Sequence, residues 1–455
     1  MDRILNAIGK ARSNQIYNAL ITESFPLCLR QAEEALNRGL TPFPVVVKDC
    51  FNVKDLKVTC ASDMLKNYTS LYTSTVVDRL ISKGGCVIGK SNMDEFAMGA
   101  SSLDSKYGPV KNGFSPLDKI DEDWLISGGS SGGSAVAVQL GMADVGIGSD
   151  TGGSTRNPAA FCGLVGFKPS YGALSRFGLI PLVNSLDTVS IFAKDVGKTI
   201  IYFDIMRGIC EKDSTSFDCP KEIIDKDRKL TIGLPKEYFT DTLTKEAKNA
   251  VNKAANILSD LGHKIVHVSM PHTEYSILCY HIINEVDVTS NMARFTGLFY
   301  GESNSNETSA DEMMTKSRTL NLNSTVKRRI FAGNYFTMKK NNRIHYLEAL
   351  KIRRMIFQDF QNVFANECDL LLTPVTSSTS PLKSAYLKDK VNQERMDDYY
   401  TQGANMAGVP AISIPISKAA NRLPLSVQLM AGFGKDDLLL HVAEVLEKNH
   451  SLISC

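Results

Sequence analysis

The chain has 455 residues, of which 43% are hydrophobic and 22% charged, a balance that excludes a disordered or fibrous protein. Its 51 Lys and Arg residues nearly cancel its 49 Asp and Glu residues, so the formal charge of +2 excludes a protein that binds nucleic acid mainly through overall charge. No run of residues approaches the roughly 18 uninterrupted apolar positions that a membrane-spanning helix needs.

The N-terminal part of the chain alternates predicted helices and strands. Residues 1–40 are predicted to be helical, and 43–48 (FPVVVK) form a short buried strand that ends in a lysine. Helical spacing follows over 76–83, and another buried strand is predicted over 85–89. Glycine is concentrated between 128 and 178, where we expect tight loops and close backbone packing.

The middle of the chain, from 219 to about 327, is more polar, and the glycine motifs stop there. From this point on we expect a strand over 231–235, a helix over 244–261, a strand over 263–268, a long surface loop over 301–325, a helix over 343–365 and a strand over 369–374. Strands that alternate with helices favour an α/β fold. With no repeat or low-complexity linker, we predict one domain over 1–455, with a core at about 40–200, a variable portion at about 219–327 and the rest of the core at about 328–440.

Ten scattered cysteines indicate reduced core thiols in an intracellular compartment. No CxxC occurs, so neither a zinc site nor a thioredoxin-type site is indicated, and we expect no metal in this chain. The N-terminus carries Arg3, Lys10 and Arg12 but lacks the apolar core of a secretory signal, and it could be the remnant of an organellar targeting helix.

Two common motifs match the sequence but fail in their context. Gly84–Ser91 fits the phosphate-loop pattern GxxxxGK[ST], yet the segment before it is predicted to be a helix and its own residues a strand. Gly129–Gly133 fits the GxSxG pattern of hydrolases, yet the segment before it is a poor strand. All seven histidines lie at 263 or later, outside any motif, so a nucleophilic serine here is not expected to use histidine as its base.

Two Gly/Ser segments carry the strongest signal for chemistry. They are Ser127–Ser134 (SGGSSGGS) and Gly148–Pro158 (GSDTGGSTRNP), joined by an apolar Ala/Val-rich stretch of helix-like composition. Glycines before a serine let several backbone N–H groups point to one spot, as in an oxyanion hole, although a pair of tight turns is the simpler interpretation. A buried lysine can be neutral and act as a base, so Lys48 makes a Ser-Ser-Lys arrangement possible.

The run from Gly128 to Gly172 resembles the signature of the amidase signature family. The resemblance implies an α/β fold with a large mixed β-sheet core covered by helices. It also implies that Ser154 is the nucleophile, Ser130 the bridging serine after a cis peptide bond, and Lys48 the base. Backbone N–H groups of Thr151, Gly152, Gly153 and Ser154 would form the oxyanion hole, and Asp150 and Arg156 would brace the loop.

Within this family, residues 40–435 are most similar to the A subunits of glutamyl-tRNA(Gln) amidotransferases. The similar segments are Val47–Asp49, Gly89–Gly99, Ser175–Gly178, Ser185–Asp187, Val326–Ile330 and Asn405–Pro415. The resemblance implies that Tyr280, Arg329 and Asp398 hold the substrate glutamine. The adjacent Arg328 and Asp397 are alternatives for the last two, and a solvated basic helix face is the simpler interpretation of the Lys327–Arg329 run.

The same resemblance implies a glutaminase that supplies ammonia for the ATP-dependent conversion of Glu-tRNA(Gln) to Gln-tRNA(Gln). The partners would be a B subunit, which uses ATP and Mg²⁺, and a small third subunit in a heterotrimer, with the tRNA reached through the complex. No cofactor is expected in this chain. The short segment before Lys48, the short C-terminus and the Asn-rich middle favour a trimmed mitochondrial, fungal-type form in the matrix over a bacterial one.

Two rival functions stay open. A free-standing amidase on another small amide would keep Lys48, Ser130 and Ser154 but would not need Arg329 and Asp398 as a pair. A catalytically idle scaffold subunit is disfavoured, because it would have no reason to keep Lys48.

Overall fold

An eleven-stranded sheet runs through the computed structural model, which describes residues 1–303 and 309–450. Its strand order is β1-β3-β2-β4-β6-β5-β10-β11-β9-β7-β8. The strands are β1 (Leu20–Glu23), β2 (Phe43–Lys48), β3 (Gly85–Ser91), β4 (Val145–Asp150), β5 (Val165–Lys168), β6 (Thr188–Ala193), β7 (Thr231–Pro235), β8 (Lys264–Val268), β9 (Leu370–Pro374), β10 (Ala411–Lys418) and β11 (Pro424–Ala431). β2 is parallel to β3 and β4, and β7 is parallel to β8 and β9, while the other pairs are antiparallel. The predicted mixed α/β sheet is confirmed.

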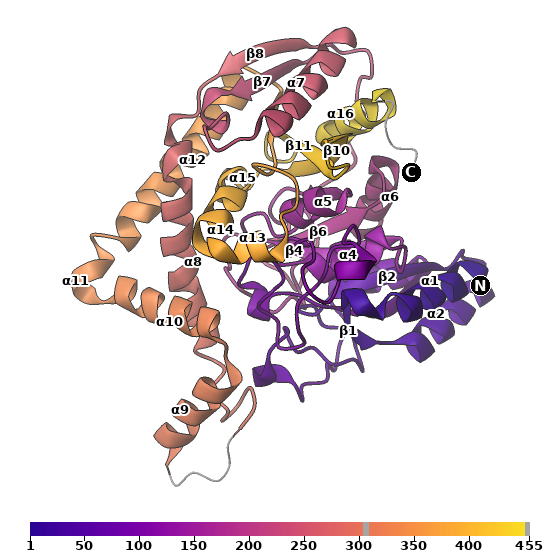
Figure 1. The fold of residues 1–455 in the computed structure, drawn as a ribbon, viewed down its shortest axis with the longest axis vertical. Coiled ribbons are helices and arrows are strands. Elements are labelled where there is room, and N and C mark those ends of the chain that lie inside the picture. The colour runs from indigo at the N-terminus through magenta and orange to yellow at the C-terminus, as the bar shows by residue number, and fades with distance from the viewer. Residues whose placement is uncertain (304–308, 451–455) are drawn as a thin grey trace.

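Helices cover both faces of this sheet (Figure 1). They are α1 (Asp2–Ser13), α2 (Phe25–Asn37), α3 (Thr75–Ser82), α4 (Gly132–Gln139), α5 (Arg156–Cys162), α6 (Val196–Met206), α7 (Lys245–Asp260), α8 (Ser276–Met292), α9 (Ala310–Asn321), α10 (Ser324–Thr337), α11 (Lys339–Asn342), α12 (Tyr346–Asn366), α13 (Lys383–Lys388), α14 (Lys390–Tyr399), α15 (Gln402–Ala407) and α16 (Asp436–Asn449). Short 3₁₀ helices span Gln15–Tyr17, Asp63–Leu65, Glu95–Ala97, Leu117–Lys119, Lys236–Tyr238 and Pro271–Tyr275. Strands from all three predicted portions of the chain join the one sheet.

The strand β2 shows how the two faces are built and where its terminal lysine points. Val46 packs with α1, α2, α4 and α5, whereas Val45 and Val47 belong to the larger core on the other face, which includes α3 and α6. Successive side chains of a strand point to opposite faces, so Lys48 shares the face of Val46. Lys48 is thereby directed toward the start of α4, which begins within the first Gly/Ser segment.

Helices α8 to α12 form an arm that extends from the body at the left of Figure 1. Within the arm, α10 packs closely on α8, and a Cβ on Gly333 would collide with the backbone oxygen of Glu285. Tyr280 and Arg329 lie on these two helices, so this close contact sets the distance between them.

Most of the predicted elements are confirmed, and two are wrong. The predicted strands at 43–48, 85–89, 231–235, 263–268 and 369–374 and the helices at 76–83, 244–261 and 343–365 are present within a few residues. Residues 1–40 are not all helical, because Leu20–Glu23 pairs with β3 at the edge of the sheet. The predicted loop over 301–325 contains α9, whose residues are polar because almost all of them face solvent; residues 304–308 lie outside the described residues.

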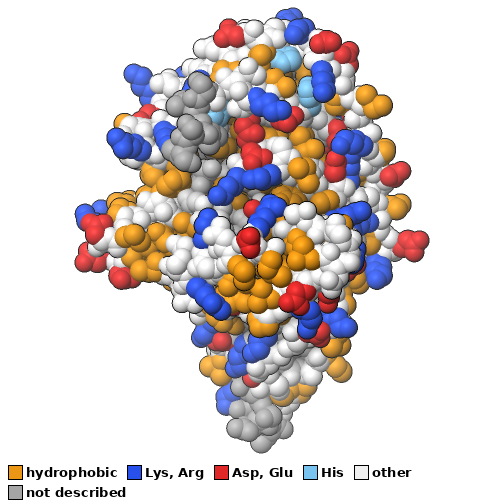
Figure 2. Space-filling view, turned by 90° about the vertical axis from the view of Figure 1, so that its right-hand side faces the viewer, with side chains coloured by type: hydrophobic (Ala, Val, Ile, Leu, Met, Phe, Trp, Pro, Cys, Tyr) orange, Lys and Arg blue, Asp and Glu red, His pale blue; other side chains and the backbone are white. Residues whose placement is uncertain are grey.

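The surface carries charges of both signs. Figure 2 shows blue and red side chains interspersed over the face at the right of Figure 1, in keeping with the near-zero net charge. Within residues 1–303 and 309–450, every helix falls short of the length or the apolarity needed to cross a membrane. The nine cysteines in these ranges are free and buried, as the sequence predicted.

Candidate active site

Lys48, the last residue of β2, is fully buried at the end of a strand that is itself buried on both faces. Its Nζ lies 2.7 Å from Ser130 Oγ and 2.9 Å from Ser149 Oγ, so the amine contacts one hydroxyl from each Gly/Ser segment. Burial lowers the pKa of Lys48, because the charged ammonium is poorly solvated there, and nearby acidic groups oppose this shift only in part. A lysine in this setting can be neutral and accept a proton.

Ser130 follows a cis peptide bond with Gly129, as the family resemblance implied. A Cβ on Gly129 would collide with Asp94 and with the backbone of Ser101, so only glycine fits there. The backbone oxygen of Ser130 accepts a hydrogen bond from the Asp94 N–H at 3.3 Å. These contacts hold the Ser130 hydroxyl beside the Lys48 amine.

Ser154 lies in the loop between β4 and α5 and opens onto a cavity. Its backbone oxygen accepts a hydrogen bond from the Ser131 N–H at 3.2 Å, so the two Gly/Ser segments are tied together next to Ser130. Among the described residues, the Ser154 hydroxyl makes no hydrogen bond with Ser130. The structure therefore joins Lys48 to Ser130 directly and brings Ser154 next to them through its backbone. Hydrogen bonds between catalytic side chains, such as that expected between Ser154 and Ser130, often tighten only when substrate binds.

Asp150, at the end of β4, organises the loop that carries Ser154. Its Oδ1 accepts from the Gly153 N–H at 2.9 Å, and its Oδ2 accepts from the Thr155 N–H at 3.2 Å. Arg156 donates to both carboxylate oxygens, at 2.9 Å through Nη2 and at 3.1 Å through Nε, and both side chains are fully buried. Burial by itself would raise the pKa of Asp150, but the Arg156 guanidinium lowers it to about 2. The pair therefore makes the contacts that the predicted bracing of the loop requires.

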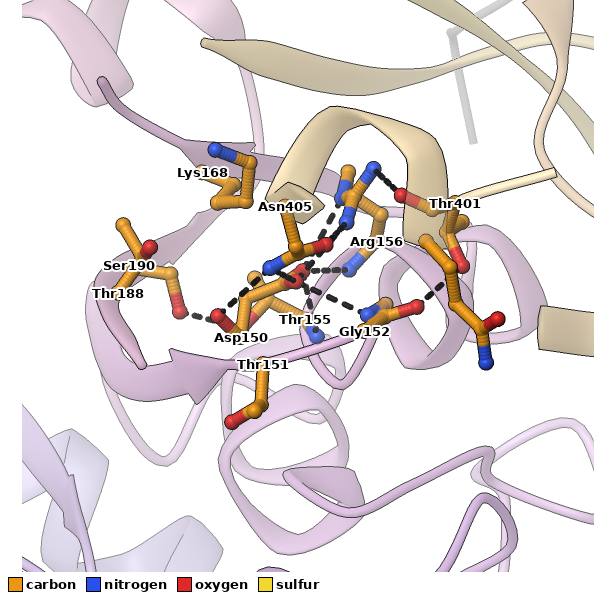
Figure 3. Close-up of polar contacts among 12 residues, drawn as sticks. Asp150, Thr151, Gly152, Thr155, Arg156, Lys168, Thr188, Ser190, Thr401 and Asn405 are labelled. Atoms are coloured by element: carbon orange, nitrogen blue, oxygen red, sulfur yellow. Dashed lines mark hydrogen bonds and ion pairs between the residues drawn. The ribbon is translucent and has the colours of Figure 1, made fainter. Parts of the chain in front are cut away.

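Arg156 also connects the loop to the C-terminal part of the chain (Figure 3). Its Nη1 donates to the Thr401 backbone oxygen at 2.8 Å and to Gln428 Oε1 at 2.7 Å. The Asn405 amide donates to the backbone oxygen and to Oδ1 of Asp150, both at 3.0 Å. Segments some 250 residues apart in sequence thus hold the loop in one conformation.

One part of the predicted oxyanion hole is corrected by this network. The N–H of Gly153 already donates to Asp150, so it is not free to bind an oxyanion in this conformation. The N–H groups of Thr151, Gly152 and Ser154 make no hydrogen bond within the described parts of the chain and stay candidates. The Gly152 backbone oxygen is held by the Thr401 hydroxyl at 2.6 Å, which fixes the peptide plane next to it.

The cavity beside Ser154 measures about 700 Å³. Three of the side chains that line it are those predicted to hold glutamine: Tyr280 from α8, Arg329 from α10 and Asp398 from α14. Arg329 Nη1 donates to Asn284 Oδ1 at 3.0 Å, and the Asn284 amide donates to the Tyr280 hydroxyl at 3.0 Å. The cavity is therefore lined both by the candidate nucleophile and by a cation that Asn284 holds in place.

Asp398 supplies the opposite charge in this cavity. Its Oδ2 accepts a hydrogen bond from the Gln402 amide at 3.2 Å. Burial and, to a smaller extent, the nearby Glu394 raise the pKa of Asp398 to about 7, although Arg329 acts to lower it. A cation and an anion in one cavity match the carboxylate and ammonium groups of a free amino acid.

Arg328 and Asp397, the alternatives for Arg329 and Asp398, lie in different surroundings. Arg328 lines the same cavity, so the structure leaves it beside Arg329 as a candidate. Asp397 is 1% exposed, does not line the cavity, and has no hydrogen-bond partner among the described residues. Of the two carboxylates, Asp398 is therefore the one that can meet a ligand in the cavity.

Sequence reasoning missed several side chains around this site. Ser149 contacts Lys48, Asn284 links Tyr280 to Arg329, and Asn405 holds Asp150. Ser149 stands directly before Asp150 in the second Gly/Ser segment, which is the signal that could have found it. One histidine, His281, also lines the cavity; burial and the surrounding arginines lower its pKa to about 4.

The amidase family model matches residues 3–440, nearly the whole chain. The chain belongs to the amidase family. Among the relatives of this amidase, the A subunit of the mitochondrial glutamyl-tRNA(Gln) amidotransferase of Bos taurus is 42% identical over 473 residues, covering 98% of this chain and 89% of the relative. The protein of the same name from Pediculus humanus subsp. corporis is 45% identical over 462 residues, covering 98% and 93%.

Solved structures of other amidases share the fold. The A subunit of glutamyl-tRNA(Gln) amidotransferase from Thermotoga maritima is 30% identical with a TM-score of 0.75, covering 98% of this chain and 94% of that one. The 6-aminohexanoate cyclic dimer hydrolase is 22% identical with a TM-score of 0.83, covering 98% and 93%, and this likeness concerns the fold alone.

Proposed function

We propose that this amidase is the glutamine-hydrolysing A subunit of a mitochondrial glutamyl-tRNA(Gln) amidotransferase. The observation that carries the proposal is the cavity in which Ser154 lies together with Tyr280, Arg329 and Asp398. A small amide without an amino-acid head would not need this pair of charges. The relatives that are 42% and 45% identical over 98% of the chain support the same function.

In the proposed reaction, Lys48 is neutral and acts as the base. It takes the proton of Ser130 while Ser130 takes the proton of Ser154, whose oxygen attacks the side-chain amide of glutamine. N–H groups of Thr151, Gly152 and Ser154 stabilise the oxyanion, each well-placed donor contributing about 3 kcal/mol. Ammonia leaves, and water then releases glutamate from the ester on Ser154.

The ammonia is used by a second protein in this proposal. A B subunit binds ATP and Mg²⁺ and amidates Glu-tRNA(Gln), and a small third subunit completes a heterotrimer in the mitochondrial matrix. This chain needs no cofactor of its own for hydrolysis, because an activated serine and backbone N–H groups suffice for acyl transfer. That this chain is the fungal-type form of the subunit stays a prediction.

The test compares two ammonia sources in the assembled complex. Formation of Gln-tRNA(Gln) is measured with glutamine and, separately, with ammonium salt, for the wild type, Ser154→Ala and a control, Ser13→Ala, on the exposed end of α1. We expect Ser154→Ala to lose only the glutamine-dependent reaction and the control to lose neither. A chain that assembles with no tRNA-amidating partner, yet hydrolyses simple amides, would instead be a free-standing amidase.

A further inference from the structure

Ser149 is the second hydroxyl beside the Lys48 amine, and the reaction proposed above gives it no role. Its Oγ lies 2.9 Å from Lys48 Nζ, and its backbone oxygen lies 3.5 Å from the same nitrogen. The Ser149 hydroxyl also lies 3.9 Å from Cys50 Sγ. Lys48, Cys50 and Ser149 are 0%, 2% and 3% exposed, so bulk water does not compete for these contacts.

The hydrogen atoms on Lys48 limit how it can act as a base. A neutral amine has two N–H groups and one lone pair, and the lone pair must face Ser130 Oγ to take its proton. Both N–H groups must then point elsewhere. Among the described residues, the other acceptors within reach are Oγ and the backbone oxygen of Ser149. The backbone oxygen can accept from Lys48 and also from Ser131 Oγ at 3.2 Å, because a carbonyl has two lone pairs.

The proton of the Ser149 hydroxyl decides whether this arrangement forms. Within the described residues its possible acceptors are Lys48 Nζ and Cys50 Sγ. Donation to Lys48 would occupy the lone pair and turn an N–H group toward Ser130. Donation to the Cys50 sulfur, a weak acceptor, leaves the lone pair free for Ser130.

We propose that Ser149 is a positioning residue that holds the lone pair of Lys48 toward Ser130, with Cys50 Sγ accepting the Ser149 proton. The inference rests on the proposed function, in which Lys48 is the base. As the bond between Ser154 Oγ and the amide carbon forms, the Ser154 proton moves to Ser130 and the Ser130 proton to Lys48. That proton returns through Ser130 to the departing nitrogen when the C–N bond breaks, and Ser149 keeps its own proton throughout.

Other charged groups face Lys48 and are left in place by changes at Ser149. Asp94 follows β3, Asp150 ends β4 and Asp187 precedes β6, and each favours the charged form of Lys48. The ion pair of Lys90 and Asp49, with Nζ and Oδ1 3.0 Å apart, lies near Cys50. A change in the titration of Lys48 in a Ser149 variant therefore reports the lost hydroxyl.

The experiment uses glutaminase kinetics of the assembled complex over a range of pH. In Ser149→Ala we expect kcat to fall about 30- to 100-fold, a large part of what a general base contributes, with KM for glutamine unchanged. The acid limb of the kcat profile moves to lower pH, because the ammonium form of Lys48 loses an acceptor. A residue that merely filled space would not shift this limb.

Matched variants separate positioning from packing. Ser149→Thr keeps the hydroxyl on a strand that accepts β-branched residues, so kcat and the acid limb return toward the wild type. Ser134→Ala removes a buried hydroxyl that bonds Ser91 Oγ at 2.7 Å and the Ile147 backbone oxygen at 3.0 Å, away from Lys48, and leaves kcat unchanged. Ammonium-dependent amidation stays at the wild-type level in every variant.

Cys50→Ala provides a second, independent test. Without the sulfur, the Ser149 proton is left to Lys48, and we expect kcat to fall about 3- to 10-fold at constant KM, the loss of one weak hydrogen bond. If Ser149→Ala fails to assemble, Cys50→Ala and Ser149→Thr decide the question. Wild-type kcat in Ser149→Ala, or a lower kcat with an unmoved acid limb in that variant, overturns the proposal, and if Ser149→Ala fails to assemble, wild-type kcat in Cys50→Ala overturns it.

The outcome for Ser154→Ala in the same assay keeps this inference apart from the proposed function. If Ser154→Ala is inactive with glutamine while Ser149→Ala behaves as the wild type, only the positioning role is wrong. If Ser154→Ala keeps its activity with glutamine, the proposed function and the positioning role both fall.

Discussion

The affinity of the cavity for glutamine is expected to depend on pH through Asp398. Its pKa is raised to about 7, so in the empty cavity the carboxyl group is mostly neutral below that pH and mostly ionised above it. Only the ionised form attracts the ammonium group of glutamine, which stays protonated over the range considered. Binding therefore strengthens as pH rises.

The magnitude follows from the ionised fraction. With a pKa of about 7, roughly three quarters of Asp398 is ionised at pH 7.5 and about one tenth at pH 6. We therefore expect KM for glutamine to rise about eightfold between pH 7.5 and pH 6. The titration of Lys48 affects kcat instead, since bound substrate already holds Asp398 in its ionised form.

Two substitutions identify the group responsible. Asp398→Asn removes a charge-assisted bond of about 2–5 kcal/mol, so KM rises by about 30-fold or more and no longer varies with pH. Glu394→Gln removes the neighbour that raises the pKa of Asp398, so the rise in KM begins at a lower pH than in the wild type.

The measurement is glutaminase kinetics of the assembled complex from pH 6 to 7.5. Ammonium-dependent amidation provides the control, because ammonia needs no contact with Asp398. A KM that stays constant over this range in the wild type, or an Asp398→Asn variant with the wild-type KM, would refute the assignment of Asp398 as the partner of the ammonium group.

Three further predictions concern the nucleophile, the base and the loop that carries them. Ser154→Ala should abolish glutamine hydrolysis, measured as glutamate release, while its melting temperature stays within a few degrees of the wild type; normal hydrolysis would contradict its role as nucleophile. Lys48→Arg should be nearly as inactive as Lys48→Ala, because an arginine stays protonated, and retained glutaminase activity would mean that position 48 needs only a charge. Arg156→Met should lower the free energy of unfolding by about 3–5 kcal/mol, because it leaves the buried Asp150 carboxylate without its cation, and denaturant unfolding that matches the wild type would argue against this pair as the brace.

The local chemistry of the core could be predicted from the sequence. The run 43–48 is made almost wholly of apolar, mainly β-branched residues, which favours a strand buried on both faces, and it forms β2 with those bounds. Gly129 and Gly152 could likewise be assigned to tight loops, where close approach of neighbouring groups leaves no room for a side chain, whereas Gly132 and Gly133 begin α4 and Gly148 lies in β4. Leu20–Glu23 could not be predicted as a strand, since so short a segment becomes one only beside the edge of β3.

The sequence by itself determined the family motif, the nucleophile and base candidates and most of the elements, because these depend on residue type and on spacing within a few turns of the chain. Only the tertiary structure decided which groups meet. Arg329 and Asp398 line one cavity because α10 and α14 both border it, and Asp397 turns away although it is the adjacent residue. Likewise, the packing of β4 beside β2 brings Ser149 to Lys48, a contact across about 100 residues that no local pattern encodes.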